Sequence, residues 1–541
     1  MTDTPRVSRP EFFRPPLEYP EIPYDQMLRH AASRWPENVA VVFRDVSLTY
    51  RELDALANRF ARALGRLGIK RGERVCLFMA NCPEYVIAFY AIARIGAVVS
   101  PMNPSYRERE VQYQIDNSDA VAVIVQQELT ALVEAVRAQL PRLRHVITVG
   151  GDAASGARSV SFASLIANEP ATPPPAVKID LGEIVALPYS SGTTGFPKGV
   201  LISHRNLVCN NIQMVACGRL RETDRLMIFL PFYHIYGAML MGASVYAGAT
   251  AVLMERFEPT ECMRLIAQHR ITLFFVVPPV LVMLIAWPEL KKHDIGSVRF
   301  TMCGAAPLAP EVGRRFTELT GVPVIQGYGM TEASPLTHLN AFHDASLNVP
   351  ESAGLLAHDT EQKVVDIETG DKILGPGEVG EICIRGPQVM QGYWKAPEAT
   401  AAALRDGWLY TGDIGYVDAH GYTFIQDRKK EMIKYKGFGI APAEIEALLF
   451  EHPGVLDAAV IGKPDAEAGE VPKAFVVKKP GHAALTADEL IAFATGRLAS
   501  YKTVQEIEFV EAIPKTASGK ILRRVLKQQE VDRMASRRAI R

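Results

Sequence analysis

The stretch YSSGTTGFPKGV spans residues 189–200 and combines glycines and hydroxyls with one lysine, Lys198. Glycines let the backbone approach an anion closely, while N–H groups and hydroxyls can surround a phosphate and a lysine adds positive charge. Pro197 and Gly199 stand where the common P-loop has a glycine before the lysine and a Ser or Thr after it. Taken alone, the stretch is therefore either a different polyphosphate-binding loop or an ordinary turn.

Length and composition set the next limits. A chain of 541 residues predicts about two to four folded units. The net charge of −1 creates no overall field that would attract nucleic acid or an anionic membrane. For the basic segment from Arg523 to Arg541 we expect a solvated helix end. Seven cysteines without a CxxC pair argue against a disulfide framework and a zinc site, and favour reduced thiols in the cytoplasm.

No segment predicts export or membrane insertion. The N-terminal residues lack a basic start that leads into an apolar run, so no secretory signal is expected. The longest apolar stretch, residues 271–287, contains Pro278-Pro279 and is too short to cross a bilayer. It predicts a buried strand over 272–277 and a helix that begins on proline.

Strand and helix patterns alternate along much of the chain, which predicts parallel βαβ units. Helices are expected over 53–67 and 84–95, and strands over 75–79, 120–125, 225–230, 250–253, 272–277, 299–303 and 323–326. The segment 150–175 is rich in Ala, Ser, Gly and Pro and predicts a surface connection.

The pattern changes after about residue 353. Short strands and turns such as 377–386 predict a small barrel or an antiparallel sheet. A final α+β portion begins near Arg428, with a helix over 442–450 and strands over 458–462 and 473–478.

Five further segments accompany the loop. They are LPFYHIYG at 230–237, CGAAPL at 303–308, QGYGMTE at 326–332, YTGD at 410–413, and DRKK at 427–430 together with PKTASGK at 514–520. In order and spacing these motifs closely resemble the adenylate-forming (ANL) acyl-CoA synthetases, with some similarity to 4-coumarate–CoA ligases. The resemblance extends from about residue 25 to 525.

The resemblance implies an α/β fold with two domains. Residues 1–427 would form a large N-terminal AMP-binding domain of two doubly wound αβα subdomains plus a small β-barrel subdomain. Residues 428–541 would form a small, mobile α+β C-terminal domain. The implied reaction is that of a fatty-acid–CoA ligase: a carboxylate attacks the α-phosphate of ATP, pyrophosphate leaves, and the thiol of coenzyme A then displaces AMP.

The resemblance also implies a set of nucleotide and coenzyme A contacts. These are Ser190, Ser191, Gly192, Thr193, Thr194, Gly195, Lys198, Gly304, Ala305, Ala306, Gly327, Tyr328, Gly329, Met330, Thr331, Asp413, Arg428, Lys434, Lys436 and Gly437. Asp413 and Arg428 would hold the ribose hydroxyls, and Tyr328 would stack on the adenine. Thr194 and Glu332 would lie near Mg²⁺, which prefers oxygen ligands. Tight core packing is the alternative explanation for the glycines, and a simple turn for Asp413.

The catalytic residues implied are Lys520, His234, Glu332 and Thr194. Lys520 would contact both the substrate carboxylate and the α-phosphate, although in isolation a lysine there would be taken as a solvated one. For His234 we expect a positioning role rather than proton transfer, against the alternative of a satisfied core histidine. Lys430 matches the hinge position of the family, about which the C-terminal domain rotates between the two half-reactions. Gly439 stands where relatives often have Gln, Asn or Arg, so a nucleotide contact is expected to be missing there.

The acyl pocket is expected to include Tyr236, Met302, Gly329, Pro335 and Leu336, with no tryptophan nearby to restrict it to acetate. Because an apolar wall discriminates by only about 0.8 kcal/mol per methylene, the preference for chain length should be soft. A medium- to long-chain fatty acid is the first choice and an aryl acid of the coumarate or benzoate type the second.

Other reactions and partners stay open. A carrier-protein adenylation module, a luciferase-type oxidation and a nucleotide-binding protein without turnover share the scaffold or part of it. The presence of Lys520 and Glu332 argues against the last of these. Peripheral membrane contact, a homodimer, and a lysine acetyltransferase acting on Lys520 are further hypotheses, because acetylation would remove the charge that the α-phosphate needs.

Overall fold

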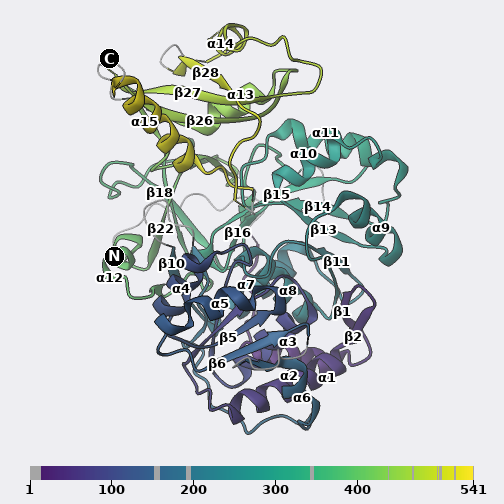
Figure 1. Ribbon diagram of the computed structural model, residues 1–541. Helices are drawn as coiled ribbons and strands as arrows, with labels where there is room; N and C mark the ends of the chain where they lie inside the picture. The colour runs from purple at the N-terminus through teal and green to yellow at the C-terminus, as the bar shows by residue number, and fades with distance from the viewer. Residues whose placement is uncertain are drawn as a thin grey trace, which may run out of the picture.

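The computed structural model describes residues 14–151, 159–190, 197–341, 347–435, 438–465, 468–495, 497–498, 502–516 and 519–539. Within these residues, two large sheets and a smaller antiparallel sheet form the N-terminal part (Figure 1). A separate unit with its own sheet lies at one end of the molecule and contains the C-terminus.

The first large sheet has the strand order β17-β16-β15-β14-β13-β11-β12-β1-β2. Its strands are β1 Val39–Phe43, β2 Val46–Thr49, β11 Arg225–Ile228, β12 Thr250–Leu253, β13 Leu273–Val276, β14 Phe300–Cys303, β15 Val324–Gly329, β16 Leu336–Leu339 and β17 Leu355–Leu356. Within this order, the neighbouring strands β15-β14-β13-β11-β12-β1 pair in parallel. All four residues of β13 are buried, as expected for a strand covered on both faces.

The second large sheet has the order β20-β10-β8-β4-β3-β5-β6-β7, with β9 beside β10. Its strands are β3 Arg74–Phe78, β4 Val98–Pro101, β5 Ala120–Gln126, β6 His145–Val149, β7 Ser159–Ser161, β8 Ile184–Ala186, β9 Tyr189–Ser190, β10 Lys198–Ser203 and β20 Gly392–Tyr393. The central strands β4, β3, β5 and β6 are parallel, which confirms the predicted βαβ organisation.

Helices cover both faces of these sheets. One group packs within the main apolar core that joins the two sheets: α1 Asp25–Arg34, α2 Tyr50–Arg66, α3 Pro83–Arg94, α7 His204–Gly218 and α8 Ile235–Ala247. Helices α9 Pro259–His269, α10 Pro278–Ala286 and α11 Pro310–Thr320 also contribute buried residues to this core. Helices α4 Glu108–Asn117 and α5 Thr130–Val136 pack in a second, smaller apolar cluster. Helix α10 begins on Pro278, as predicted, because proline is well suited to the first helical position.

Two predictions need correction. The expected connection over 150–175 contains β7 and a short helix, α6 Phe162–Ala167. Ser161 Oγ accepts a hydrogen bond from the Ser164 N–H at 3.4 Å, and the Phe162 ring packs 4.3 Å from that of Phe60. The strand predicted over 323–326 continues as far as Gly329 because β16 pairs with its last residues.

The smaller sheet precedes the C-terminal unit. It contains β18 Glu361–Val365, β19 Gly380–Arg385, β21 Leu404–Arg405, β22 Trp408–Val417 and β23 Thr423–Arg428, all paired antiparallel, with α12 Pro397–Ala403 beside them. The C-terminal unit contains β24 Ile433–Tyr435, β25 Phe438–Ile440, α13 Pro442–Phe450, β26 Val455–Asp465, β27 Gly469–Lys478, α14 Ala487–Thr495, β28 Glu506–Phe509 and α15 Arg523–Ala539. Lys430 lies in the turn between β23 and β24, where the chain passes from one sheet to the next.

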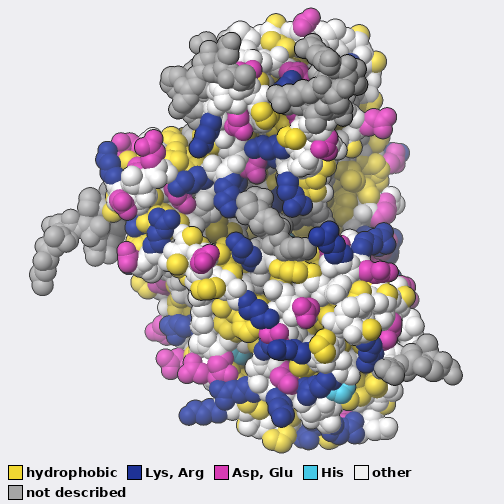
Figure 2. Space-filling view, turned by 60° about the vertical axis from the view of Figure 1, so that its left-hand side comes forward, with side chains coloured by type: hydrophobic (Ala, Val, Ile, Leu, Met, Phe, Trp, Pro, Cys, Tyr) yellow, Lys and Arg dark blue, Asp and Glu magenta, His cyan; other side chains and the backbone are white. Residues whose placement is uncertain are grey.

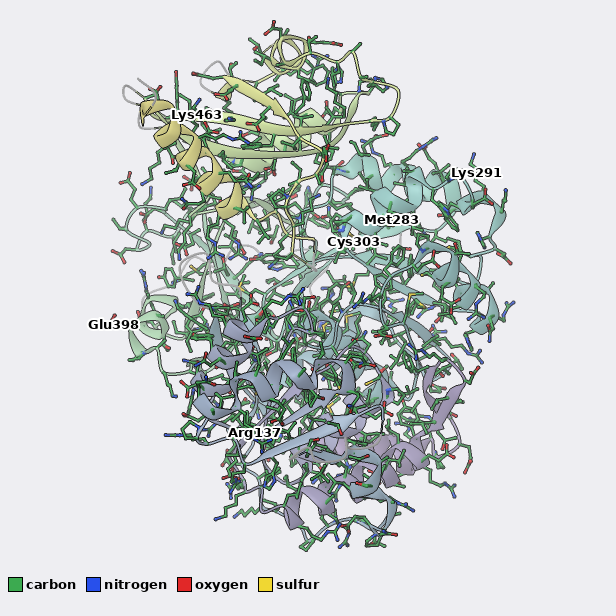
Figure 3. All side chains as sticks on the ribbon, viewed as in Figure 1. Arg137, Met283, Lys291, Cys303, Glu398 and Lys463 are labelled. Atoms are coloured by element: carbon green, nitrogen blue, oxygen red, sulfur yellow. The ribbon has the colours of Figure 1, made fainter. Side chains whose placement is uncertain are left out.

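A buried group of charges holds the C-terminal unit together. Lys473 on β27 has a side chain that is only 3% exposed, and its Nζ lies 2.6 Å from Glu530 of α15. It also lies 2.7 Å from Glu506 and 3.0 Å from Glu508, both on β28. Lys463, labelled beside α15 in Figure 3, pairs with Glu506 and Glu530. These bonds connect β26, β27 and β28 with the last helix, α15.

Thiols and surface charges agree with the sequence analysis. All seven cysteines are free and buried. On the face shown in Figure 2, acidic side chains are interspersed among the basic ones. Among the described residues, no helix has the length and apolar character needed to span a bilayer.

Candidate active site

A cavity of about 1980 Å³ lies between the N-terminal part and the C-terminal unit. It is lined by sixteen of the predicted site residues: Ser190, Lys198, His234, Tyr236, Ala305, Ala306, Gly327, Tyr328, Gly329, Met330, Thr331, Glu332, Asp413, Arg428, Lys430 and Lys520. These residues come from motifs that lie far apart in the sequence. The predicted residues 191–195, 436 and 437 fall outside the described part of the chain.

Asp413 and Arg428 form a fixed pair in the wall of this cavity. They stand opposite each other on β22 and β23, and Arg428 Nε lies 2.6 Å from Asp413 Oδ1. The Tyr328 hydroxyl donates a hydrogen bond to the other carboxylate oxygen. Burial raises the pKa of Asp413, and the Arg428 charge opposes that rise. The pair presents an acceptor and a donor on one edge, which suits two neighbouring hydroxyls.

Lys520 enters the same cavity from the C-terminal unit. Its side chain is half-buried, and its pKa is lowered by burial and by the charge of Arg428, while Asp413 and Glu332 act in the opposite direction. Hydrogen bonds between Thr516 and Lys520 close the turn that presents this lysine. The resulting cation lies within electrostatic range of the carboxylates of both Asp413 and Glu332.

The turn that carries Lys520 contacts helix α10. Gly519 has a φ of +80°, which favours glycine, and a methyl group added there would lie 2.8 Å from Pro279 Cδ. The contact therefore requires the absence of a side chain. It joins the C-terminal unit to the first turn of α10 directly beside Lys520.

His234 caps helix α8 and faces the cavity. Its Nδ1 accepts a hydrogen bond from the Tyr236 N–H at 3.3 Å. Burial, with a smaller contribution from the charge of Lys520, lowers the pKa of His234 to about 3. The imidazole is therefore neutral at physiological pH, with Nε2 carrying its proton because Nδ1 is an acceptor. A neutral ring can position a ligand but has no extra proton to give.

Glu332 and Lys198 meet at Tyr393, a residue that the sequence analysis missed. The Tyr393 hydroxyl donates to Glu332 Oε1 at 2.9 Å, and Lys198 Nζ lies 5.5 Å from the centre of the Tyr393 ring. Tyr393 reaches this place because β20 pairs with β10 beside Lys198. The signal in the sequence was the aromatic pair Tyr393-Trp394, because aromatic residues are common in strands.

The donor groups fit a magnesium ion only in part. Glu332 offers a carboxylate in the cavity wall, the kind of ligand that Mg²⁺ prefers. Among the described residues, no group of three or more His, Cys, Asp or Glu side chains could hold a metal. Such a donor set suits an ion that arrives with phosphate oxygens and waters as its other ligands.

The predicted acyl pocket lies only partly on the cavity: Tyr236 and Gly329 line it. Met302, Pro335 and Leu336 are buried and do not line the cavity. The Tyr236 hydroxyl, from the cavity lining, donates to the Met302 carbonyl at 3.3 Å. The expectation that no tryptophan lies nearby is wrong, since Trp287 lines the cavity.

Two further residues lie elsewhere than predicted. Gly304 does not line the cavity, because it packs below the surface, where a Cβ would meet the Gly327 carbonyl oxygen at 3.3 Å. Gly329 does line the cavity, but packing also requires a glycine there, because a Cβ would lie 2.0 Å from the Pro335 carbonyl oxygen. Lys434 is exposed on β24 and lies outside the cavity lining.

Both parts of the chain match a known protein family. The family model for "AMP-binding enzyme" matches residues 28–394, and that for "AMP-binding enzyme C-terminal domain" matches residues 444–520. The chain belongs to the AMP-binding enzyme family. As a member of that family it is an adenylate-forming ligase that joins an acid to a thiol.

Relatives within the family include enzymes for two kinds of acid. The chain is 37% identical to a long-chain-fatty-acid–CoA ligase of Bacillus subtilis, over 95% of this chain and 96% of that protein. It is 40% identical to 4-coumarate–CoA ligase 5 of Oryza sativa subsp. japonica, over 89% of each.

Solved structures of family members superpose over almost the whole chain. The anthranilate CoA ligase AuaEII in complex with anthranoyl-AMP has a TM-score of 0.88 at 30% identity, covering 95% of this chain and 98% of that chain. MatB from Rhodopseudomonas palustris, at 30% identity and covering 94% of this chain and 99% of that chain, has a TM-score of 0.87 with ATP bound and 0.77 in its apo form. The structure of the AMP-binding enzyme described here is therefore more similar to MatB with ATP bound than to apo MatB.

Proposed function

We propose that the protein activates a medium- to long-chain fatty acid with ATP and transfers the acyl group to coenzyme A. The observation that carries this proposal is the presence of Lys520, from the C-terminal unit, in one cavity with Asp413, Arg428 and Glu332. A cation among carboxylates at a domain junction suits a reaction in which two anions must meet.

In the first step, a carboxylate oxygen of the acid attacks the α-phosphorus and pyrophosphate leaves. Lys520 would lie between the carboxylate and the α-phosphate and offset the negative charge that both bring. The ribose hydroxyls would bind Asp413 and Arg428. Lys198 would neutralise part of the phosphate tail, and Glu332 would hold Mg²⁺, which supplies charge compensation on the leaving pyrophosphate.

In the second step, the sulfur of coenzyme A attacks the acyl carbonyl and AMP leaves. Lys520 fills part of the cavity and would have to withdraw to admit the thiol. We propose that residues 428–541 move relative to residues 1–427 by a rotation at Lys430. The neutral His234 would position the acyl carbonyl for this attack without transferring a proton.

The fatty acid is the first choice because the cavity is large and one wall is apolar. Val282, Met283, Ala286 and Trp287 of the α10 region all line it. The relationship to the long-chain-fatty-acid–CoA ligase supports the same choice. An aryl acid is the second candidate, because 4-coumarate–CoA ligases are 38–40% identical to this chain.

The test is pyrophosphate release with Mg-ATP and coenzyme A, using acetate, octanoate, dodecanoate, palmitate, benzoate and 4-coumarate. A maximum among octanoate, dodecanoate and palmitate is expected. A maximum on 4-coumarate or benzoate would keep the reaction but replace the acid. Absence of pyrophosphate release with every acid would contradict the proposal as a whole.

A further inference from the structure

Helix α7 carries a row of amide side chains in the interior of the protein. Asn206, Asn210 and Gln213 are 7%, 0% and 0% exposed. Their spacing of four and three residues places them on one side of the helix. A buried amide costs free energy unless it is hydrogen-bonded, so three of them in one row indicate a set of specific partners. The helix itself lies against β10 and β16 (Figure 1).

The first amide of the row holds the segment 387–390, which connects β19 with β20. Asn206 Nδ2 donates to the Pro387 carbonyl at 2.8 Å and to the Val389 carbonyl at 2.9 Å. Its Oδ1 accepts hydrogen bonds from the N–H and the hydroxyl of Ser203, the N-cap residue of α7. Both amide hydrogens and both lone pairs of the oxygen are thus in use.

The other side of the same segment holds the loop that contains Glu332. The Met390 N–H donates to the Glu332 carbonyl at 2.8 Å, and the Ser334 hydroxyl donates to the Gln388 carbonyl at 2.8 Å. Residues 387 and 389 therefore bind α7, whereas residues 388 and 390 bind the loop. The segment is fixed between the helix and the Glu332 loop.

The chain that follows this segment reaches the Glu332 carboxylate. Three residues after Met390, the Tyr393 hydroxyl makes its bond to Glu332 Oε1. One stretch of chain thus holds Glu332 at both its backbone carbonyl and its carboxylate. Because the Tyr393 ring also lies beside Lys198, the position of this stretch determines how the carboxylate stands relative to that cation.

The second amide holds the end of the Glu332 loop. Asn210 Oδ1 accepts a hydrogen bond from the Leu336 N–H at 3.0 Å, and its Nδ2 donates to the Leu336 carbonyl at 2.8 Å. It binds both backbone groups of one residue, as a neighbouring antiparallel strand would. Asn210 Nδ2 also donates to Gln213 Oε1 at 3.0 Å, and Gln213 Nε2 donates to Gln388 Oε1 at 3.3 Å. The bonded row therefore makes a rigid support for the loop.

We propose that Asn206 and Asn210 are positioning residues for Glu332, which they hold where it meets the phosphate tail of Mg-ATP. Neither asparagine lines the cavity, so both act through the backbone that carries Glu332. This inference rests on the proposed function, in which Glu332 holds Mg²⁺, and adds the residues that orient that ligand. Loss of groups that orient a metal ligand typically lowers metal affinity by about 10–100-fold.

Asn206→Asp separates this role from the capping of α7. An aspartate keeps an oxygen for Ser203, but its second oxygen carries no proton for the Pro387 and Val389 carbonyls. Mg-ATP and AMP are titrated by calorimetry, without acid or coenzyme A. The affinity for Mg-ATP should fall by about tenfold or more, whereas AMP, which has no phosphate tail, should bind within about twofold of the wild-type affinity.

A double variant tests whether Asn206 acts through Glu332. Glu332→Gln alone should weaken the binding of Mg-ATP, because it removes the charge that faces the ion. Adding Asn206→Asp should weaken it by no more than about a further twofold, since effects that pass through one group do not add. Losses that multiply, or a wild-type affinity of Glu332→Gln for Mg-ATP, would overturn the inference.

Asn58→Asp is the matched control for a charge introduced at a buried amide. Asn58 is 2% exposed and bonds to Asp54 and Arg94, and none of these three residues lines the cavity. Its affinities for Mg-ATP and AMP should both remain close to wild type. Asn210→Ala serves if Asn206→Asp fails to fold, with the same expected result. Equal losses for Mg-ATP and AMP, or a wild-type affinity for Mg-ATP in the asparagine variants of α7, would contradict the positioning role.

Turnover distinguishes the two proposals. If the wild type binds Mg-ATP and releases pyrophosphate with 4-coumarate but not with dodecanoate, the proposed fatty-acid function fails, and the titrations still decide the role of the amide row. If dodecanoate is a substrate and Asn206→Asp binds Mg-ATP like the wild type, the proposed function stands and the positioning inference fails.

Discussion

At the scale of single residues, Lys520 has the clearest separable role. Lys520→Ala should lower the rate of adenylation by about 10²–10³-fold, because one charge on the developing transition state is lost. Thioester formation from a supplied acyl-adenylate should stay near the wild-type rate. Pyrophosphate release and acyl-CoA formation, measured separately, check this, and an equal loss in both steps would contradict the role assigned to Lys520.

Gly519 should be required for the same half-reaction. In Gly519→Ala, the new methyl group would lie 2.8 Å from Pro279 Cδ and would push the Lys520 turn away from α10. We expect adenylation to fall by about tenfold or more, with thioester formation much less affected.

The control for Gly519 is Gly481→Ala. Gly481 has a φ of +86°, and a methyl group added there would have no other atom within 4 Å, so the variant reproduces the backbone strain without the contact. Adenylation by that variant should remain close to wild type. Similar losses in both variants would mean that strain alone, rather than contact with Pro279, explains the effect.

Where a motif supplied both residue type and place, the structure brings the predicted site residues together in one cavity. Asp413 and Arg428 are one such case, because neighbouring strands bring two separate motifs together. Tyr393 was not predicted, because its position depends on the pairing of β20 with β10, and no local sequence pattern predicts that pairing. Met302, Pro335 and Leu336 lie buried outside the cavity lining, because a motif fixes the path of the backbone but not which side chains reach the cavity surface.

At the scale of elements, the turn between β23 and β24 controls the second step. A proline at position 430 fixes φ and restricts the preceding residue, so it should prevent rotation of the chain there. Lys430→Pro should keep adenylation within about twofold and lower thioester formation by about tenfold or more.

Lys430→Ala is the matched control for the turn, because it removes the side chain and leaves the backbone free. Both half-reactions should continue in that variant. If Lys430→Pro carries out both half-reactions at the wild-type rate, rotation does not occur at this position.

Most elements followed from the pattern of apolar residues, because strands such as β13 are continuous apolar runs of the right length. The short elements β7 and α6 did not. They depend on Ser161, which caps a short helix, and on Phe162, which packs on the distant Phe60. The segment is rich in small residues, and this composition predicts neither element.

At the scale of the whole molecule, the Lys473 group should determine the stability of the C-terminal unit. Lys473→Met removes the partner that lies 2.6 Å from Glu530, whose side chain is 4% exposed, and leaves it only the longer contacts with Lys463 at 3.5 Å and Arg533 at 4.0 Å. Removing one member of a buried pair costs about 3–5 kcal/mol. Chemical denaturation followed by a probe in the C-terminal unit should show this loss. The exposed pair Arg264–Glu261 is the control, and Arg264→Met should cost about 1 kcal/mol or less.

The same group predicts a dependence on acid. Burial alone would raise the pKa of Glu506 and Glu508, but hydrogen bonds from Lys463, Lys473 and Arg533 outweigh it and lower both. The ionised carboxylates therefore stabilise the folded unit at neutral pH, and this contribution disappears as the pH falls through the lowered pKa values. Thermal unfolding of the wild type should show the loss below the usual range of a glutamate. A loss that begins near neutral pH would contradict it.

The burial of all seven thiols has a practical consequence. Burial raises the pKa of Cys76 to about 12 and also raises that of Cys303, so these two groups react slowly with maleimides in the folded protein. Arg14 and His358 lower the pKa of Cys217, so for that thiol burial alone limits the reaction. A cysteine introduced on the exposed side of α12 and another on the exposed side of α15 would thus be the preferred sites of labelling without removal of the native ones. Energy transfer between dyes at those two sites could follow the domain rotation during a single catalytic cycle.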